Sequence, residues 1–152
     1  MENLNVAARR HAGWNRSAVA WLLVLTVGLW VTGVAMHLSV RHSVLDLPLW
    51  QENLQRGATV SHGILTWLFC FMAGRWIWPH INLVWRRRSH PWIWAIGITT
   101  AAGGAILAGA GLGLLYAPAP WHDALSLTHW WTGLLWPVVC ASHAWKRLLR
   151  RR

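Results

Sequence analysis

The sequence predicts an all-α integral membrane protein, built as a four-helix bundle with its N- and C-termini in the cytoplasm. Three observations lead to this fold class: four long runs whose only charged residue is Arg75, other basic residues that lie in the segments around these runs, and few acidic residues. The 152-residue chain is 55% hydrophobic, yet it carries a net charge of +10 and only four acidic residues, a combination unusual for a soluble domain. We therefore expect one transmembrane domain over residues 1–152.

Each of these runs supplies about the 20 residues that a helix needs to cross a bilayer. Lipid leaves no partner for open backbone groups, so these runs should be helical. We expect helices at about 17–40, 57–85, 91–116 and 122–146, with a kink at Pro79. A long loop should join the first pair and a short one the last pair. Because the segment Arg86–His90 is also short, the second and third helices should be neighbours.

The basic residues define the orientation. An even number of crossings separates their three clusters, so all three fall on one side of the membrane, which the positive-inside rule makes the cytoplasm. We expect no cleavable signal peptide and a multi-pass protein of the bacterial inner (cytoplasmic) membrane. The basic residues flank apolar runs instead of interleaving with them, which argues for membrane lipid and against nucleic acid as a partner. The clusters are Arg9, Arg10 and Arg16; Arg86, Arg87 and Arg88; and Lys146, Arg147, Arg150, Arg151 and Arg152.

Histidines inside membrane spans are the main functional signal, because a polar side chain there is costly. His62 and His80 are eighteen residues apart, so they share a helix face about 27 Å apart. His129 and His143 are fourteen residues apart, which places them about 40° apart around the helix and about 21 Å apart along it. The two helices run in the same direction. One histidine of each pair should therefore lie near each membrane surface.

This spacing predicts two b-type hemes stacked across the membrane, because imidazoles from facing helices are good iron ligands. At the inner site we expect His80 with His143. The outer partner of His129 is either His62, favoured because it shares a face with His80, or His37, whose depth of about 31 Å is nearer the value of about 26 Å for His129; His62 is the first choice. The sequence contains no C-x-x-C-H motif, which argues against covalently attached heme.

Several of these residues resemble the bacterial cytochrome b561 superfamily. Thr128–Gly133, followed by His143, resembles the last helix of that superfamily, and Thr32–His37 resembles its first. His62 and the segment His80–Asn82 resemble the second helix of related small cytochromes. The resemblance implies a four-helix bundle with two b-type hemes that passes electrons between quinone and a partner. Some members anchor larger oxidoreductases, and one relative oxidises superoxide.

The sequence departs from the family pattern in two places. Many relatives have a ligand histidine at the inner start of the first helix, where this chain offers only His11, beyond Arg16. Some have a second-helix histidine fourteen residues after the first, a position held here by Trp76. Both departures favour His80 as the inner ligand. The family also implies that Arg75 pairs with a heme propionate, while snorkelling of its side chain towards water is the alternative.

The leading function is transfer of electrons between the quinone pool and a redox partner protein, either alone or as the membrane subunit of a larger oxidoreductase. The sequence leaves open whether the chain is itself an enzyme, of the quinone oxidoreductase or superoxide oxidase type. The alternative is a subunit of a respiratory or photosynthetic supercomplex that binds bacteriochlorophyll or is purely structural. Paired histidines favour heme, because chlorophyll magnesium usually takes one axial histidine. A transporter is disfavoured, since no half-helix break or buried carboxylate marks a binding site at the middle of the membrane.

Overall fold

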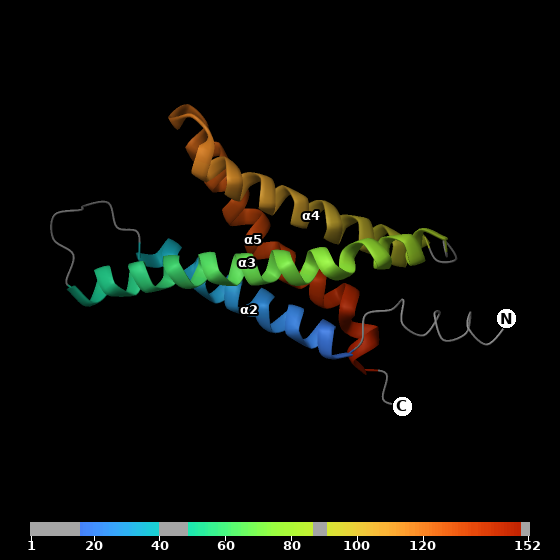
Figure 1. Cartoon of the computed structure of the whole chain (residues 1–152). Helices are drawn as coiled ribbons and strands as arrows, with labels where there is room; N and C mark the ends of the chain where they lie inside the picture. Colours follow the sequence, from blue (N-terminus) through green and yellow to red (C-terminus); the bar gives the residue numbers. More distant parts are fainter. Residues whose placement is uncertain (1–15, 40–48, 87–90, 150–152) are drawn as a thin grey trace.

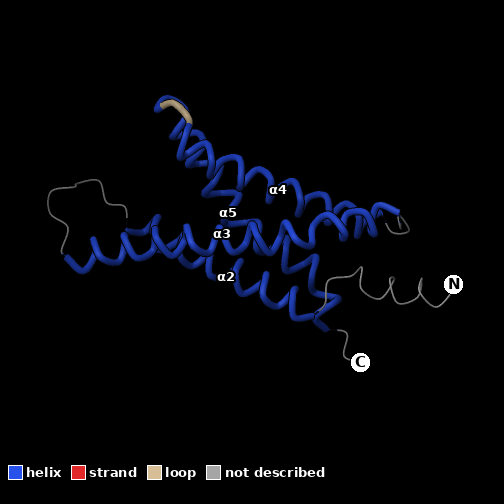
Figure 2. Tube along the Cα trace, viewed as in Figure 1, coloured by secondary structure: helices blue, strands red, loops and turns tan. Residues whose placement is uncertain are grey.

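The computed structural model describes residues 16–39, 49–86 and 91–149, and the described chain is all-α (Figure 2). It contains four helices and one short 3-10 turn, so the predicted fold class is confirmed at this level. The backbone N–H of Ala117 donates to the Gly113 carbonyl at 2.8 Å and closes the last turn before the loop. The elements are α2 (Arg16–Ser39), α3 (Leu49–Arg86), α4 (Pro91–Tyr116), η1 (Ala119–Trp121) and α5 (His122–Leu149).

Three of the helices, α2, α3 and α4, are long and apolar enough to cross a membrane, over Ser17–Ser39, Leu49–Asn82 and Trp94–Tyr116. Helix α5 has 28 residues and is about 42 Å long at 1.5 Å per residue. Its three histidines and four tryptophans lower its hydropathy, which is why composition alone does not place it with the other three.

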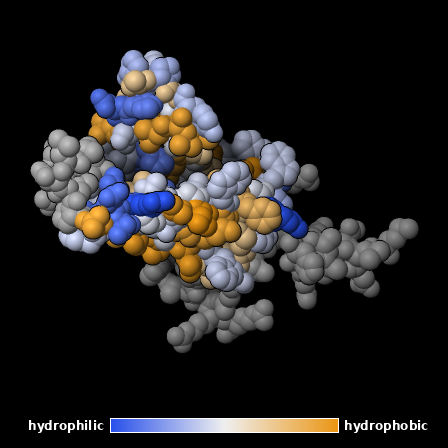
Figure 3. All heavy atoms as spheres, turned by 60° about the vertical axis from the view of Figure 1, so that its left-hand side comes forward, coloured by the Kyte–Doolittle hydropathy of each residue, from blue (hydrophilic) through white to orange (hydrophobic). Residues whose placement is uncertain are grey.

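The described helices expose most of their large apolar side chains. The buried set consists mainly of small residues such as Ala18, Ala58, Ala73 and Ala110, while Trp67 is 81% exposed. Figure 3 shows apolar side chains over much of the visible face. An apolar surface of this extent is unusual for a soluble monomer and is typical of a surface that contacts lipid.

The helices pack as two hairpins. Helix α2 packs along α3, α4 packs along α5, and contact between α2 and α5 joins the two hairpins. Helices α3 and α4 meet beside their connecting turn, where the ring centroids of Trp85 and Trp94 are 5.9 Å apart, and then diverge (Figure 1). The expectation that these two helices are neighbours therefore holds only at their joined ends, because a short turn fixes the ends and not the crossing angle.

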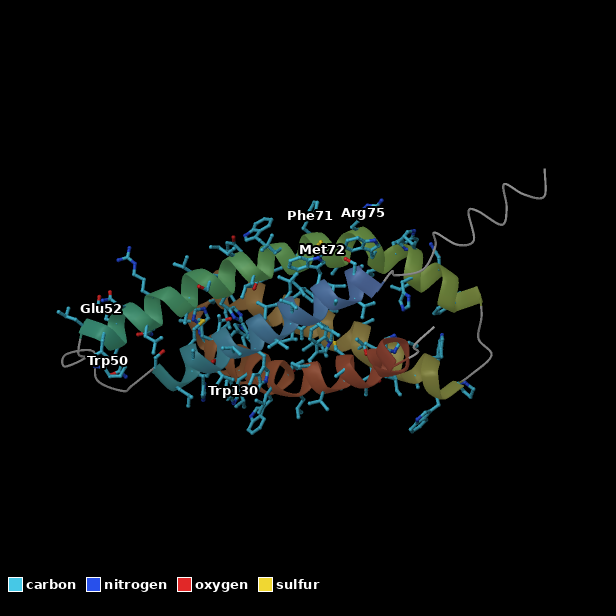
Figure 4. The ribbon with its side chains drawn as sticks, turned by 90° about the horizontal axis from the view of Figure 1, so that it is seen from below. Trp50, Glu52, Phe71, Met72, Arg75 and Trp130 are labelled. Carbon is cyan, nitrogen blue, oxygen red and sulfur yellow. The ribbon has the colours of Figure 1, made fainter. Side chains whose placement is uncertain are left out.

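The first turns of α3 differ from the prediction. The helix begins at Leu49 and not near residue 57, so the predicted long loop is shorter by eight residues. The added segment contains Gln51, Glu52 and Arg56, polar residues that end a hydrophobic run without ending a helix, and Glu52 in the first turn is favoured by the helix dipole. Trp50 and Glu52 lie at this end of α3, which continues through Pro79 and curves along its length (Figure 4).

The helix ends that adjoin the basic clusters lie together. The start of α2, the end of α3, the start of α4 and the end of α5 are all at one end of the molecule (Figure 1). Arg16, Arg86, Lys146 and Arg147 belong to these helix ends. The remaining cluster residues lie outside the described residues, as do three histidines: Arg9, Arg10, Arg87, Arg88, Arg150, Arg151, Arg152, His11, His42 and His90.

Candidate functional site: ring pairs between α3 and α5

Three pairs of rings bridge α3 and α5. The centroid separations are 6.4 Å for His62 and His129, and 6.0 Å for His80 and His143. Between them, Phe69 and Trp136 form an edge-to-face contact at 5.6 Å. Helices α3 and α5 do not pack closely along their backbones, and these ring side chains bridge the space between them. The structure thus brings together both histidine pairs that the sequence predicts.

The spacing within each histidine pair suits a shared metal ion. A metal–imidazole bond is about 2 Å long and the ring centre lies about 1 Å behind the bonded nitrogen, so two imidazoles on opposite sides of one metal have centroids about 6 Å apart. Aromatic rings in edge contact cover the same range of distances. The interplanar angles are 72° for the outer pair and 85° for the inner pair. The spacing is therefore compatible both with a shared metal ion and with a simple ring contact, and the positions of the ring protons help to decide between them.

Hydrogen bonds assign the protons of the outer pair. Nδ1 of His129 lies 3.2 Å from the Leu107 carbonyl oxygen, and because a carbonyl only accepts, Nδ1–H donates. Nδ1 of His62 lies 2.9 Å from Thr32 Oγ1. The Thr32 hydroxyl donates to the Gly28 carbonyl at 2.8 Å, so its oxygen accepts from His62. In the neutral form of each ring the proton is therefore on Nδ1, which leaves Nε2 as a lone-pair donor.

This arrangement is typical of histidines that bind metals. Such residues usually donate Nδ1–H to a carbonyl or another acceptor, which fixes the tautomer and the ring orientation and strengthens Nε2 as a ligand. Two neutral imidazoles at the spacing of a shared metal form the donor set of a low-spin heme iron. By its donors and its spacing, the outer pair His62 and His129 fits this group, and the inner pair fits it by its spacing.

Three of the four histidines rest on a glycine of the neighbouring helix in the same hairpin. A Cβ added at Gly111 would lie 3.3 Å from His129 Cε1, one at Gly97 would lie 3.4 Å from His143 Cε1, and one at Gly33 would lie 3.4 Å from His62 Cε1. A side chain that extends beyond Cβ at these positions would push the ring towards the opposite helix. Gly97 and Gly111 of α4 therefore serve close packing against the histidine rings of α5.

A seven-residue spacing on both helices of the second hairpin was missed from the sequence. His129, Trp136 and His143 follow one another in steps of seven on α5, and Gly111, Gly104 and Gly97 face them in steps of seven on the antiparallel α4. A step of seven is close to two helical turns, so each set lies along one face. This match of rings to glycines would have identified Trp136 as a member of the site.

The two hairpins repeat the geometry of the outer site. His129 rests on Gly111 and donates to the carbonyl of Leu107, four residues earlier. His62 rests on Gly33, and the backbone of Leu29, again four residues earlier, also lies beside its ring. The inner sites differ, because His80 lies eighteen residues after His62 while His143 lies fourteen after His129. The matching outer sites of the two hairpins therefore support an internal repeat of one helical hairpin.

His37 is the alternative outer ligand, and the structure places it elsewhere. Its exposed ring stacks on Trp130, with centroids 3.7 Å apart and planes 15° apart. The residue that faces His129 is His62. The depth count favoured His37 because it treated every helix as straight and upright, whereas α3 curves along its length (Figure 4).

Arg75 does not join either histidine pair. Its side chain is exposed and projects with Phe71 from the side of α3 that faces away from the other helices (Figure 4). Five residues separate Arg75 from His80, which turns the two side chains about 140° apart on the helix. This position favours snorkelling over a propionate contact.

Within the described ranges, potential metal ligands gather in pairs, and no group of three or more histidine, cysteine or acidic residues is present. Cys70 and Cys140 are free thiols. His122 donates from Nε2 to the Ala117 carbonyl at 2.9 Å, a bond that ties the start of α5 to the preceding loop.

The chain matches no protein-family model, no curated protein and no solved structure. The resemblance to the cytochrome b561 superfamily therefore stays a prediction. The function is inferred from the ring pairs, their hydrogen bonds and the apolar helices that hold them.

Proposed function

We propose that this protein is a diheme membrane cytochrome b that passes electrons between the quinone pool and a redox partner protein. The observation that carries the proposal is the placement of two histidine pairs between α3 and α5, with centroids 6.4 Å and 6.0 Å apart. Each pair would hold one heme through its two imidazole side chains. A bound heme supplies a one-electron iron couple.

The residues around the outer pair have distinct tasks in this proposal. Thr32 and the Leu107 carbonyl hold the protons of His62 and His129 on Nδ1, which keeps both Nε2 atoms available as ligands. Gly33 and Gly111 leave space for the two rings. Ligands held in this way would suit a bound group that exchanges one electron, because their positions are already fixed by the protein.

In the proposed arrangement all four helices cross the inner membrane, and the basic clusters lie in the cytoplasm. Helix α5 packs along α4, which is itself apolar enough to span. The proposed spans have their basic ends at one end of the molecule (Figure 1). Under the positive-inside rule, that end faces the cytoplasm.

Reporter fusions test this orientation. A fusion after Arg152 and a fusion between Arg86 and His90 are both expected to report a cytoplasmic position, because an even number of crossings separates them. A fusion between Ala117 and Pro120 should report the periplasm and serves as the control. A periplasmic signal at the C-terminus would mean that α5 does not cross the membrane.

The absorption spectrum of the purified protein tests the cofactor. Reduction with dithionite is expected to give the sharp α band of a low-spin b-type heme, because both axial positions are imidazole. Bands in the far red or near infrared would identify bacteriochlorophyll and support the pigment-binding alternative. A colourless protein, obtained from cells supplied with heme precursors, would support a structural subunit.

A further inference from the structure

We propose that Trp136, together with Phe69, forms the path along which electrons pass between the outer and inner sites. This inference rests on the proposed function and deepens it, because it names the residues that connect the two cofactors.

The pair lies between the two sites on both helices. Trp136 is seven residues after His129 and seven before His143, so about 10 Å of helix separates it from each. Phe69 lies seven residues after His62 and eleven before His80, on the same face of α3 as both. The contact between Phe69 and Trp136 therefore joins α3 and α5 between the histidine pairs.

The indole of Trp136 is held on three sides. Nε1–H donates to the Thr100 carbonyl at 2.8 Å. The ring lies so close to α4 that a Cβ at Gly103 would be 2.6 Å from its Cδ1, and one at Gly104 would be 3.4 Å from its Cζ2. Phe69 meets the ring with its plane at 78°. Glycine lowers helix stability, so two adjacent glycines here reserve space for a large ring.

The proposed path requires the two rings to support electron transfer only. One electron leaves the reduced site and one arrives at the oxidised site, while no bond forms or breaks and the indole is unchanged at the end. Closely packed atoms carry an electron better than a gap or a lipid chain, and two aromatic rings fill the middle of the span with few bonds between them. A shorter aliphatic side chain at residue 136 would leave unfilled space at this point.

The test measures electron exchange between the two hemes in the purified diheme protein. A flash reductant loads a fraction of the chains with one electron, and the absorption change records how fast that electron redistributes between the hemes. Trp136→Leu is expected to slow the redistribution severalfold, and Trp136→Phe to slow it less. Trp131→Leu, a change at an exposed tryptophan on the same helix, is the matched control and should leave the rate unchanged.

Heme content, the low-spin spectrum and both midpoint potentials are measured on every variant, since the inference requires them to stay as in the unaltered protein. If Trp136→Leu does not retain both hemes, Trp136→Phe and Phe69→Leu take its place with the same expected slowing. Unaltered rates in variants that hold two hemes would overturn the inference and leave the proposed function intact. Absence of heme from the unaltered protein would instead remove the proposed function, and this inference with it.

Discussion

His129→Ala is expected to reduce the heme content of the purified protein from two per chain to one. Loss of an axial imidazole leaves five-coordinate iron, which the protein retains weakly, whereas a change outside the ligand set only retunes the iron. The remaining heme should keep its low-spin spectrum, because the inner histidines lie about 21 Å away along the helix and distant sites behave independently. A pyridine hemochrome assay gives the count.

Two further variants identify the outer partner. His62→Ala should cause the same loss as His129→Ala, since these two rings face each other at 6.4 Å. His37→Ala should keep two hemes, because the His37 ring stacks on Trp130 and not on His129. The reverse pattern, loss with His37→Ala and retention with His62→Ala, would make α2 the ligand helix and contradict the observed pairing.

His143→Ala and His80→Ala are each expected to remove the inner heme and leave the outer one. The reason is again the loss of an axial ligand, here from the pair at 6.0 Å. The outer heme that remains should disappear from the double variant His143→Ala/His129→Ala. Trp76→Phe is the control, because some members of the family that the sequence resembles have their ligand histidine at the position that Trp76 occupies in this chain. Loss of the inner heme from Trp76→Phe, with retention in His80→Ala, would contradict the inner pairing.

A glycine pair on α4 provides a test that leaves both ligands in place. A Cβ at Gly97 would lie 3.4 Å from His143 Cε1, whereas a Cβ at Gly109 meets nothing within 4 Å. Gly97→Leu should therefore displace the His143 ring, so that the inner heme becomes high-spin or is lost. Gly109→Leu should leave both hemes low-spin. Equal effects of the two changes would mean that the ring does not depend on its glycine support.

Hydrophobic run length was enough to predict the four helices, because a run of about 20 apolar residues has few alternatives to a helix in lipid. The same signal misplaced the start of α3, since the residues from Gln51 to Arg56 are polar yet helical. Loop length, in turn, did not predict how α3 packs against α4. Loop length constrains the ends of two helices, while the side chains between them decide how far they diverge.

The expectation that His62 and His80 share one face of α3 followed from helical periodicity, which depends only on rotation within one helix. The choice between His62 and His37 depended on depth across two helices, and so on tilt and curvature that a sequence does not specify. Trp136 escaped notice because one tryptophan in a span rich in tryptophan does not stand out unless the seven-residue match between the α5 rings and the α4 glycines is considered. Its significance lies in contacts with Gly103, Thr100 and Phe69 on two other helices.

The number of b-type hemes per chain tests the central claim most directly. A pyridine hemochrome assay on the purified protein, normalised to protein by amino-acid analysis, should give two hemes per chain, with both irons low-spin in the oxidised state. One heme per chain would contradict the two-site arrangement and leave either His62 with His129 or His80 with His143 as the sole site. A protein that binds no heme, when produced with an adequate heme supply, would contradict the assignment of these histidines as iron ligands.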